Sequence, residues 1–166
     1  YQKHRAEWLI RNRPGLTPLL KMAASVLPSK FSSRENSIKN KIRQLHRFAE
    51  GATLSNKERY LRWCSFTTAN YRNELLLKPF ANDLKNRNQQ LSTYVKHQTS
   101  MNDVLLSDMK LVLTGDMLRK VDSMSMANSL EVRSPFLDYR VVDFAFSLTD
   151  KYKIDNKAQK KIVKDA

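Results

Sequence analysis

The sequence predicts an all-α fold, and three observations support that prediction. Apolar residues recur at spacings of three and four, as on one face of a helix, whereas the alternation of a β-strand is nearly absent. Helix-start signals of the type Ser-x-x-Glu occur between the apolar stretches. With 41% hydrophobic residues over 166 positions, the chain can bury one core. We therefore expect a single helical unit over 1–166 and no sheet of three or more strands.

The first part of the chain is expected to form two amphipathic helices. Thr17 followed by Pro18 predicts an N-cap and a first-turn proline, and this helix should end near Leu27. Apolar residues at helical spacing over 38–49 predict a second helix, and Gly51 is its expected stop.

The middle of the chain is more polar. Ser55 and Glu58 have the spacing of a capping box and predict the start of a further helix. Residues 79–98 predict one or two polar helices. Loop character is nevertheless strongest over 28–37 and 85–99.

The last third of the chain carries the strongest helix signals. Ser100 is the expected start of an apolar helix buried on most sides, and another helix should follow over 116–128. Pro135 interrupts the helical pattern. Asp138 is the expected N-cap of a further amphipathic helix, and residues 158–166 begin the last one.

The composition excludes several classes of protein and of site. No apolar run is long enough to span a membrane, and no signal-peptide pattern opens the chain. One cysteine, Cys64, cannot form an internal disulfide and suits a reducing compartment such as the cytoplasm. The chain begins at Tyr1 rather than at Met, which favours a piece of a longer polypeptide. A phosphate-binding glycine loop is excluded by the wide spacing of Gly15, Gly51 and Gly115. Metal-ligand spacing is absent among His4, His46 and His97, so we expect no metal site.

The charge is strongly positive and unevenly distributed. Of the net +14, residues 1–100 contribute +13, from 19 basic and 6 acidic residues. Such asymmetry occurs in nucleic-acid-binding modules, which is one alternative for the function. Basic residues here alternate with core residues instead of forming a dense run. We therefore favour solvated helix faces, offset by acidic parts of a larger chain, and expect no specific nucleic-acid binding.

Charged residues interrupt an otherwise apolar stretch over 120–138. Burying these charges would be costly unless they form ion pairs or have a role in a functional site. Asp122 lies at the edge of an apolar stripe, either facing a substrate cleft or paired with a basic residue. Glu131 and Arg133 share one side of an extended segment, where a bond to a neighbouring helix is plausible. On these residues alone, the structural interpretation is at least as strong as the catalytic one.

Lysines cluster near the start of the last predicted helix, at positions 157, 160, 161 and 164. Lysines at a helix N-terminus suit a phosphate group, but a solvated basic face has the same pattern. Charge alone favours the solvated face.

Four stretches resemble the synthetase domain of glutamine-hydrolysing asparagine synthetases. The longest is VDSMSMANSLEVRSPFLD at 121–138, followed by VDFAFSL at 142–148. The tail KKIVKDA at 160–166 is similar to the family pattern Lys-x-Ile-Leu-Arg-x-Ala, and the opening YQKH resembles residues that follow the family's substrate loop. Residues 15–100 look like the family's variable helical region.

The resemblance implies an N-terminal glutaminase domain followed by an ATP-pyrophosphatase domain of α/β type, whose helical part this chain would supply. The pyrophosphate loop, the acidic loop and the glutaminase domain would precede Tyr1, and a second phosphate-contacting lysine would follow Ala166. Such enzymes use Mg-ATP to adenylate the side chain of aspartate, and ammonia from glutamine then forms asparagine. We expect the fragment alone to bind no cofactor and to be inactive, and the whole enzyme to be cytoplasmic; a homo-oligomer is left open.

The resemblance also assigns residues. Lys160 aligns with a lysine that contacts phosphate, and Lys120 and Asp122 align near the substrate pocket. The pocket wall would be held by Glu131, Arg133 and Asp138, and no residue here is assigned as catalytic. The family often has glycine before the tail lysine, whereas this chain does not. A related amidotransferase of the β-lactam or peptide-cyclising type is an alternative, acting on another carboxylate.

Overall fold

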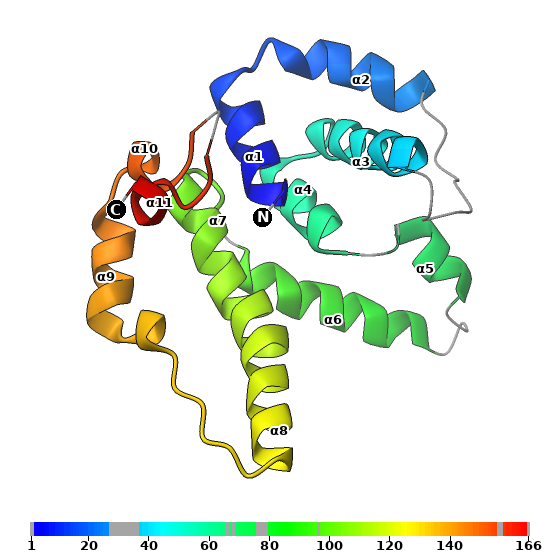
Figure 1. Ribbon diagram of the computed structural model, residues 1–166. Coiled ribbons are helices and arrows are strands. Elements are labelled where there is room, and N and C mark those ends of the chain that lie inside the picture. The colour runs from blue at the N-terminus through cyan, green and yellow to red at the C-terminus, as the bar shows by residue number, and fades with distance from the viewer. Residues whose placement is uncertain are drawn as a thin grey trace. The chain divides into compact units, whose positions relative to one another are not determined.

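The structure is a computed structural model that describes residues 2–26, 37–65, 67, 69–75, 80–95, 97–155 and 158–165. Regular structure in these residues is helical, apart from one isolated antiparallel bridge between Ile154 and Gln159. The described residues contain no sheet, so the all-α prediction is confirmed. The chain divides into two compact units, Tyr1–Lys96 and His97–Ala166 (Figure 1). The assignment of residues 1–166 to one domain stays a prediction.

The described helices of the first unit are α1 (Gln2–Asn12), α2 (Leu16–Val26), α3 (Ser37–Ala52), α4 (Asn56–Cys64), α5 (Ala69–Leu75) and α6 (Ala81–Tyr94). Those of the second unit are α7 (Met101–Asp108), η2 (Met109–Leu118), α8 (Arg119–Ala127), η3 (Pro135–Leu137), α9 (Tyr139–Ser147), α10 (Asp150–Lys153) and α11 (Lys161–Asp165). Here η2 is a π-helical stretch and η3 a single 3₁₀ turn.

A buried ion pair joins α1 to α4 in the first unit. The guanidinium of Arg59 donates from Nε and Nη2 to the two carboxylate oxygens of Glu7, at 2.8 Å each. Arg11, one turn along α1, also donates to Glu7 at 2.7 Å. Glu7 and Arg59 are 2% and 4% exposed, so loss of either partner would leave a charge in a poorly solvated place. The pair thus fixes where the two helices meet.

Glycine has a packing role where α3 meets α4. A Cβ atom placed on Gly51 would lie 2.2 Å from Nε1 of Trp63, which no side chain could tolerate without movement. The Trp63 indole donates from Nε1 to the carbonyl of Arg47 at 3.0 Å and stacks on the ring of Phe48. Gly51 was expected to stop this helix, but α3 continues to Ala52 and no described glycine has a positive φ. Its role is close approach, not left-handed capping.

The local capping signals were largely correct. Ser55 with Glu58, and Ser100 with Asp103, each form a complete capping box at the starts of α4 and α7. The polar region forms one helix, α6, so the expected loop character over 85–99 is wrong as far as Tyr94. α2 begins at Leu16 instead of after Thr17, and α1 was not predicted at all. The loop expected over 28–37 lies almost wholly outside the described residues.

One continuous helical run replaces the two helices expected between Ser100 and residue 128. α7, η2 and α8 follow each other without a break, and residues at both junctions keep right-handed helical dihedrals. Gly115 does not end the helix, and nothing lies within 4 Å of where its Cβ would be. The run in Figure 1 therefore forms one long rod in the second unit.

Burial in this rod is confined to its first turns. Met101 and Val104 are buried, as is Ile154 later in the same unit. From η2 onward, exposed apolar side chains predominate, with Met124 64%, Phe136 74% and Tyr139 73% exposed. The expectation that the helix after Ser100 is buried on most sides therefore holds only for its beginning.

None of the helices in the described part of the chain is both long enough and apolar enough to cross a membrane.

Candidate functional site

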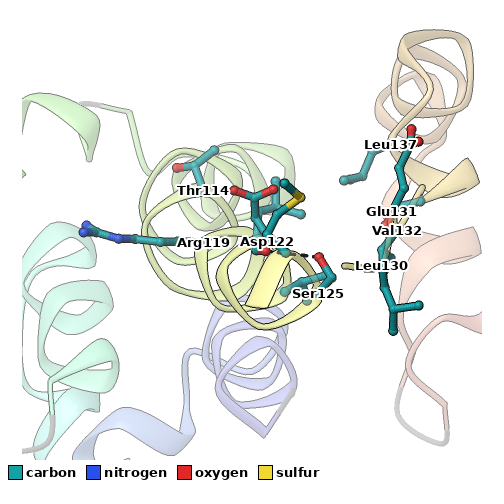
Figure 2. A pocket seen from close by; sticks show the side chains of 12 residues that line it. Thr114, Arg119, Asp122, Ser125, Leu130, Glu131, Val132 and Leu137 are labelled. Carbon is teal, nitrogen blue, oxygen red and sulfur yellow. Dashed lines mark hydrogen bonds between the residues drawn. The ribbon is translucent and has the colours of Figure 1, made fainter. Parts of the chain in front are cut away.

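An open groove of about 570 Å³ lies in the second unit, between the end of the long helical run and the segment 130–137. The helix contributes Thr114, Leu118, Arg119, Val121, Asp122, Ser125 and Met126 to its lining. The opposite wall consists of Leu130, Glu131, Val132, Ser134 and Leu137. Figure 2 shows the two walls facing each other across open space. The groove is thus built from the stretch that the sequence analysis singled out.

Asp122 and Ser125 place polar atoms on the helical wall. Both residues line the groove, and the Ser125 hydroxyl donates to the backbone carbonyl of Asp122 at 3.1 Å. The helical wall therefore carries the Asp122 carboxylate and the Ser125 hydroxyl among the apolar side chains of Leu118, Val121 and Met126. Such a wall can orient a small polar ligand through a few directed contacts.

Lys120 does not line the groove with Asp122. Its ammonium pairs with Asp116 one helical turn earlier, at 2.5 Å, and both side chains are at least half exposed. Arg119 is the basic residue among the lining side chains, but its guanidinium extends away from the opposite wall in Figure 2. The structure therefore brings Asp122 to the groove and leaves Lys120 on another side of the helix.

Glu131 and Arg133 bind each other instead of a neighbouring helix. Arg133 donates from Nε to Glu131 at 2.8 Å, and its Nη2 lies 2.5 Å from the same oxygen. The two residues share one side of the extended segment, as their spacing predicted. Their side chains are 86% and 73% exposed, so the pair adds little to stability. Glu131 also lines the groove, which makes its carboxylate accessible there.

Asp138 is the N-cap of α9, as the sequence predicted. Its carboxylate accepts from the backbone N–H of Arg140 at 2.9 Å and from Nε and Nη2 of the same residue at 2.9 and 2.7 Å. Hydrogen bonds from the side chain and then the backbone of Arg140 lower the pKa of Asp138. Asp138 thus sets the direction in which the chain leaves the wall of the groove.

Lys160 occupies an unusual backbone conformation just before α11. Its φ is 56°, in the left-handed region that residues with a Cβ rarely adopt. Its carbonyl accepts from the N–H groups of Val163 and Lys164, at 3.1 and 3.2 Å, so it begins the helix. The side chain is exposed. No glycine directly precedes Lys160 in this chain, and the left-handed backbone conformation falls on the lysine itself.

The lysines of the tail differ in their surroundings. Lys161 pairs with Asp155 at 2.9 Å, and this hydrogen bond and the charge of Asp155 raise the pKa of Lys161. Lys164 is exposed on α11, and Lys157 lies outside the described residues. The cluster is therefore not one uniform basic face.

Sequence reasoning missed a contact that joins three helices of the second unit. The ammonium of Lys153 donates to the side-chain carbonyl of Asn102, whose amide donates to the carbonyl of Phe146 at 2.8 Å. Lys153 also lies over the Phe146 ring, 5.6 Å from its centroid, and burial lowers the pKa of Lys153. The ends of α7, α9 and α10 are tied together here. Nothing in the sequence pairs residues 51 positions apart.

Several arginines of the basic first unit are engaged within it. Arg59 and Arg11 bind Glu7, and Arg62 pairs with Glu50 at 2.8 Å. These contacts account for three of the basic side chains of the first unit. Among the described residues, no group of three or more His, Cys, Asp or Glu side chains could hold a metal ion.

The second unit is thus a helical structure that combines an open groove, lined by Asp122, Ser125 and Glu131, with a lysine-bearing turn before α11. The sequence model of the asparagine synthase family matches residues 1–166, and the chain belongs to that family. It is 38% identical over 92 residues to asparagine synthetase [glutamine-hydrolyzing] 1 of Bacillus subtilis (strain 168). That match covers 50% of this chain and 15% of the relative. No solved structure matches the chain.

Proposed function

We propose that this chain is the helical part of a synthetase that converts aspartate to asparagine at the expense of ATP, with glutamine as nitrogen donor. The observation that carries the proposal is the family match over residues 1–166. The name of the Bacillus relative, asparagine synthetase [glutamine-hydrolyzing] 1, supports aspartate as the acceptor and glutamine as the nitrogen donor. The activity would belong to the whole polypeptide, since the match spans only 15% of that relative.

The reaction would proceed in two steps. An oxygen of the aspartate side-chain carboxylate attacks the α-phosphorus of ATP, and the bond to the pyrophosphate group breaks. Ammonia then attacks the acyl carbon of the adenylate, AMP leaves, and the ammonium proton goes to a base or to water. The first step places negative charge on the departing pyrophosphate, which cationic groups and Mg²⁺ would stabilise.

In this proposal Lys160 contacts the departing pyrophosphate. Its side chain is exposed, and its carbonyl accepts from the N–H groups of Val163 and Lys164, so Lys160 lies at the start of α11. A point charge on a long flexible stem suits a phosphate group better than a planar guanidinium does when one contact is needed. Asp122 would face the substrate from the groove, while Glu131, Arg133 and Asp138 hold the opposite wall. Lys120 would act only if its ion pair with Asp116 opens.

The segments that would complete the site are a glutaminase domain, a pyrophosphate loop and an acidic loop. This chain lacks a glycine-rich loop, so we propose that ATP and Mg²⁺ are held mainly by those other segments. The 166-residue chain by itself should therefore release no pyrophosphate from ATP and aspartate.

The test uses the full-length protein that carries these residues, with ammonia supplied directly so that glutamine hydrolysis is bypassed. Lys160→Ala should lower the rate of pyrophosphate release by roughly 30- to 1,000-fold, with a smaller effect on the KM for ATP. The larger effect on turnover is expected because the charge of the leaving group develops only in the transition state.

Lys164→Ala is the matched control, because it removes an exposed lysine from the same helix. Lys161 is unsuitable as a neutral control, since its ion pair with Asp155 belongs to the turn. Equal and small effects of Lys160→Ala and Lys164→Ala would show that the tail is a solvated basic face. Turnover of another carboxylic acid in preference to aspartate would assign the protein to a related amidotransferase.

A further inference from the structure

The carboxylate of Asp155 contacts the chain on both sides of Lys160. One oxygen accepts a hydrogen bond from the backbone N–H of Ala158 at 2.7 Å. The other oxygen lies 2.9 Å from the ammonium of Lys161. Ala158 precedes the strained lysine and Lys161 follows it, so a single side chain spans that residue.

The conformation of Lys160 needs such support. A lysine with a φ of 56° persists only where its surroundings impose that geometry. Before Lys160, the Ile154–Gln159 bridge closes the turn, and the N–H of Asp155 donates to the carbonyl of Ala158 at 2.9 Å. After Lys160, the N–H groups of Val163 and Lys164 donate to its carbonyl. The Asp155 side chain connects these two sets of backbone bonds.

The geometry points to Asp155 as a positioning residue, whose carboxylate holds the turn so that the ammonium of Lys160 stays where it can contact the departing pyrophosphate. This inference rests on the proposed role of Lys160. Asp155 itself would touch neither ATP nor aspartate, and would act only through the placement of Lys160.

Asp155 would also separate the functions of two adjacent lysines. The ammonium of Lys161 contacts the carboxylate of Asp155 within the turn, and this ion pair raises the pKa of Lys161. Of the two lysines, Lys160 has the more exposed side chain. The side chains of Asp155 and Lys161 are 32% and 38% exposed, so the ion pair lies at the surface of the turn. A pair this exposed adds little to stability, and its main effect is to hold the geometry of the turn.

The experiment measures pyrophosphate release in the full-length protein, with saturating ammonia and aspartate and varied ATP. Asp155→Ala removes both contacts and should lower kcat by roughly 10- to 100-fold, because small displacements of a catalytic charge are costly. The KM for ATP should change by about twofold or less. Asp155→Asn can still accept from Ala158 but cannot form the ion pair, so it should retain an intermediate kcat.

The decisive variant combines Asp155→Ala with Lys160→Ala. If Asp155 acts through Lys160, the double variant should turn over no more slowly than Lys160→Ala alone. If instead the two losses multiply, Asp155 acts independently and the inference is overturned. A purely structural residue would reduce kcat in both backgrounds alike, so this readout separates positioning from general stability.

The remaining outcomes distinguish this inference from the proposed function. A normal kcat for Lys160→Ala would reject the role of Lys160, and the positioning role of Asp155 would fail with it. A low kcat for Lys160→Ala together with a normal kcat for Asp155→Ala would reject the positioning role alone. If Asp155→Ala fails to fold, Asp155→Asn and Lys161→Met decide, since each removes the ion pair and leaves a side-chain oxygen at residue 155 to accept from the Ala158 N–H. Wild-type kcat in both of those variants would overturn the inference.

Discussion

Replacing Gly51 by alanine tests how closely α3 approaches α4. The added methyl group would lie 2.2, 2.5 and 2.8 Å from Nε1, Cε2 and Cζ2 of Trp63, all ring atoms with little freedom to yield. Movement of the indole would strain the hydrogen bond from Trp63 to the carbonyl of Arg47 and the stacking on Phe48. The substitution therefore disturbs one interface and leaves the rest of the first unit unchanged.

Three contributions set the expected size of the effect. Overpacking costs about 1–3 kcal/mol. Loss of the indole hydrogen bond costs about 0.5–1.5 kcal/mol. Replacement of glycine in a helix returns about 0.5–1 kcal/mol, since alanine has the better helix propensity. The net destabilisation should be about 2 kcal/mol, which corresponds to a fall in Tm of roughly 10 °C for a unit of this size.

Urea denaturation followed by tryptophan fluorescence measures this effect, because Trp63 itself reports on the interface. Gly115→Ala is the control, since no atom lies within 4 Å of its added Cβ and it sits inside a helical run. That variant should be stabilised by about 0.5–1 kcal/mol, measured by circular dichroism because both tryptophans, Trp8 and Trp63, lie in the first unit. A neutral or stabilising Gly51→Ala would show that the two helices do not approach each other as described. Equal effects of the two substitutions would lead to the same conclusion.

Two further predictions concern the first unit. Glu7→Leu should destabilise it by about 3–5 kcal/mol in urea denaturation, and adding Arg59→Leu should recover part of that loss, because the unpaired buried cation is then gone. No recovery would mean that the ion pair is not the source of the loss. Hydrogen bonds from the side chain and backbone of Ser55 lower the pKa of Glu58 from its usual 4.5. The stabilisation is therefore complete above pH 4.5 and is lost as the pH falls through the lower folded pKa. A helicity titration by circular dichroism should show this loss in the wild type and a smaller loss in Ser55→Ala, which keeps only the backbone donor; losses of equal size in the two proteins would contradict the prediction.

Local signals were readable from the sequence because their physics is local. The capping boxes at Ser55 and Ser100 and the cap at Asp138 each involve residues two or three positions apart. The all-α class follows from the same short-range periodicity. Contacts of this range need no knowledge of how the helices pack, so pattern alone identified them.

The interactions that position distant elements could not be read in the same way. The contact between Asn102 and Lys153 joins residues 51 positions apart, and neither belongs to a recognisable pattern. Gly51 looked like a helix stop because glycine serves both to end a helix and to admit a bulky neighbour, and only the position of Trp63 distinguishes the two.

The candidate site shows both situations. Asp122 lies at the groove that its motif suggested, whereas Lys120 turns to Asp116, a partner that helical spacing also allowed. For Lys161, the sequence showed one more lysine in a basic cluster. Its ion pair with Asp155 depends on a turn that pattern analysis does not describe. The assignments of Lys160, Lys120, Asp122 and the wall residues stay predictions until the variants are measured.

The exposed apolar side chains beyond η2 have a practical consequence for anyone who produces this chain alone. Phe136 and Tyr139 are about three-quarters exposed, and Met124 nearly two-thirds. A water-facing surface of this kind promotes self-association, so preparations should be handled dilute and checked for aggregates. Polar substitutions at these positions would then improve the yield of the isolated chain. The same substitutions could be harmful in the full-length protein, so solubility screens on the short chain would select in the wrong direction.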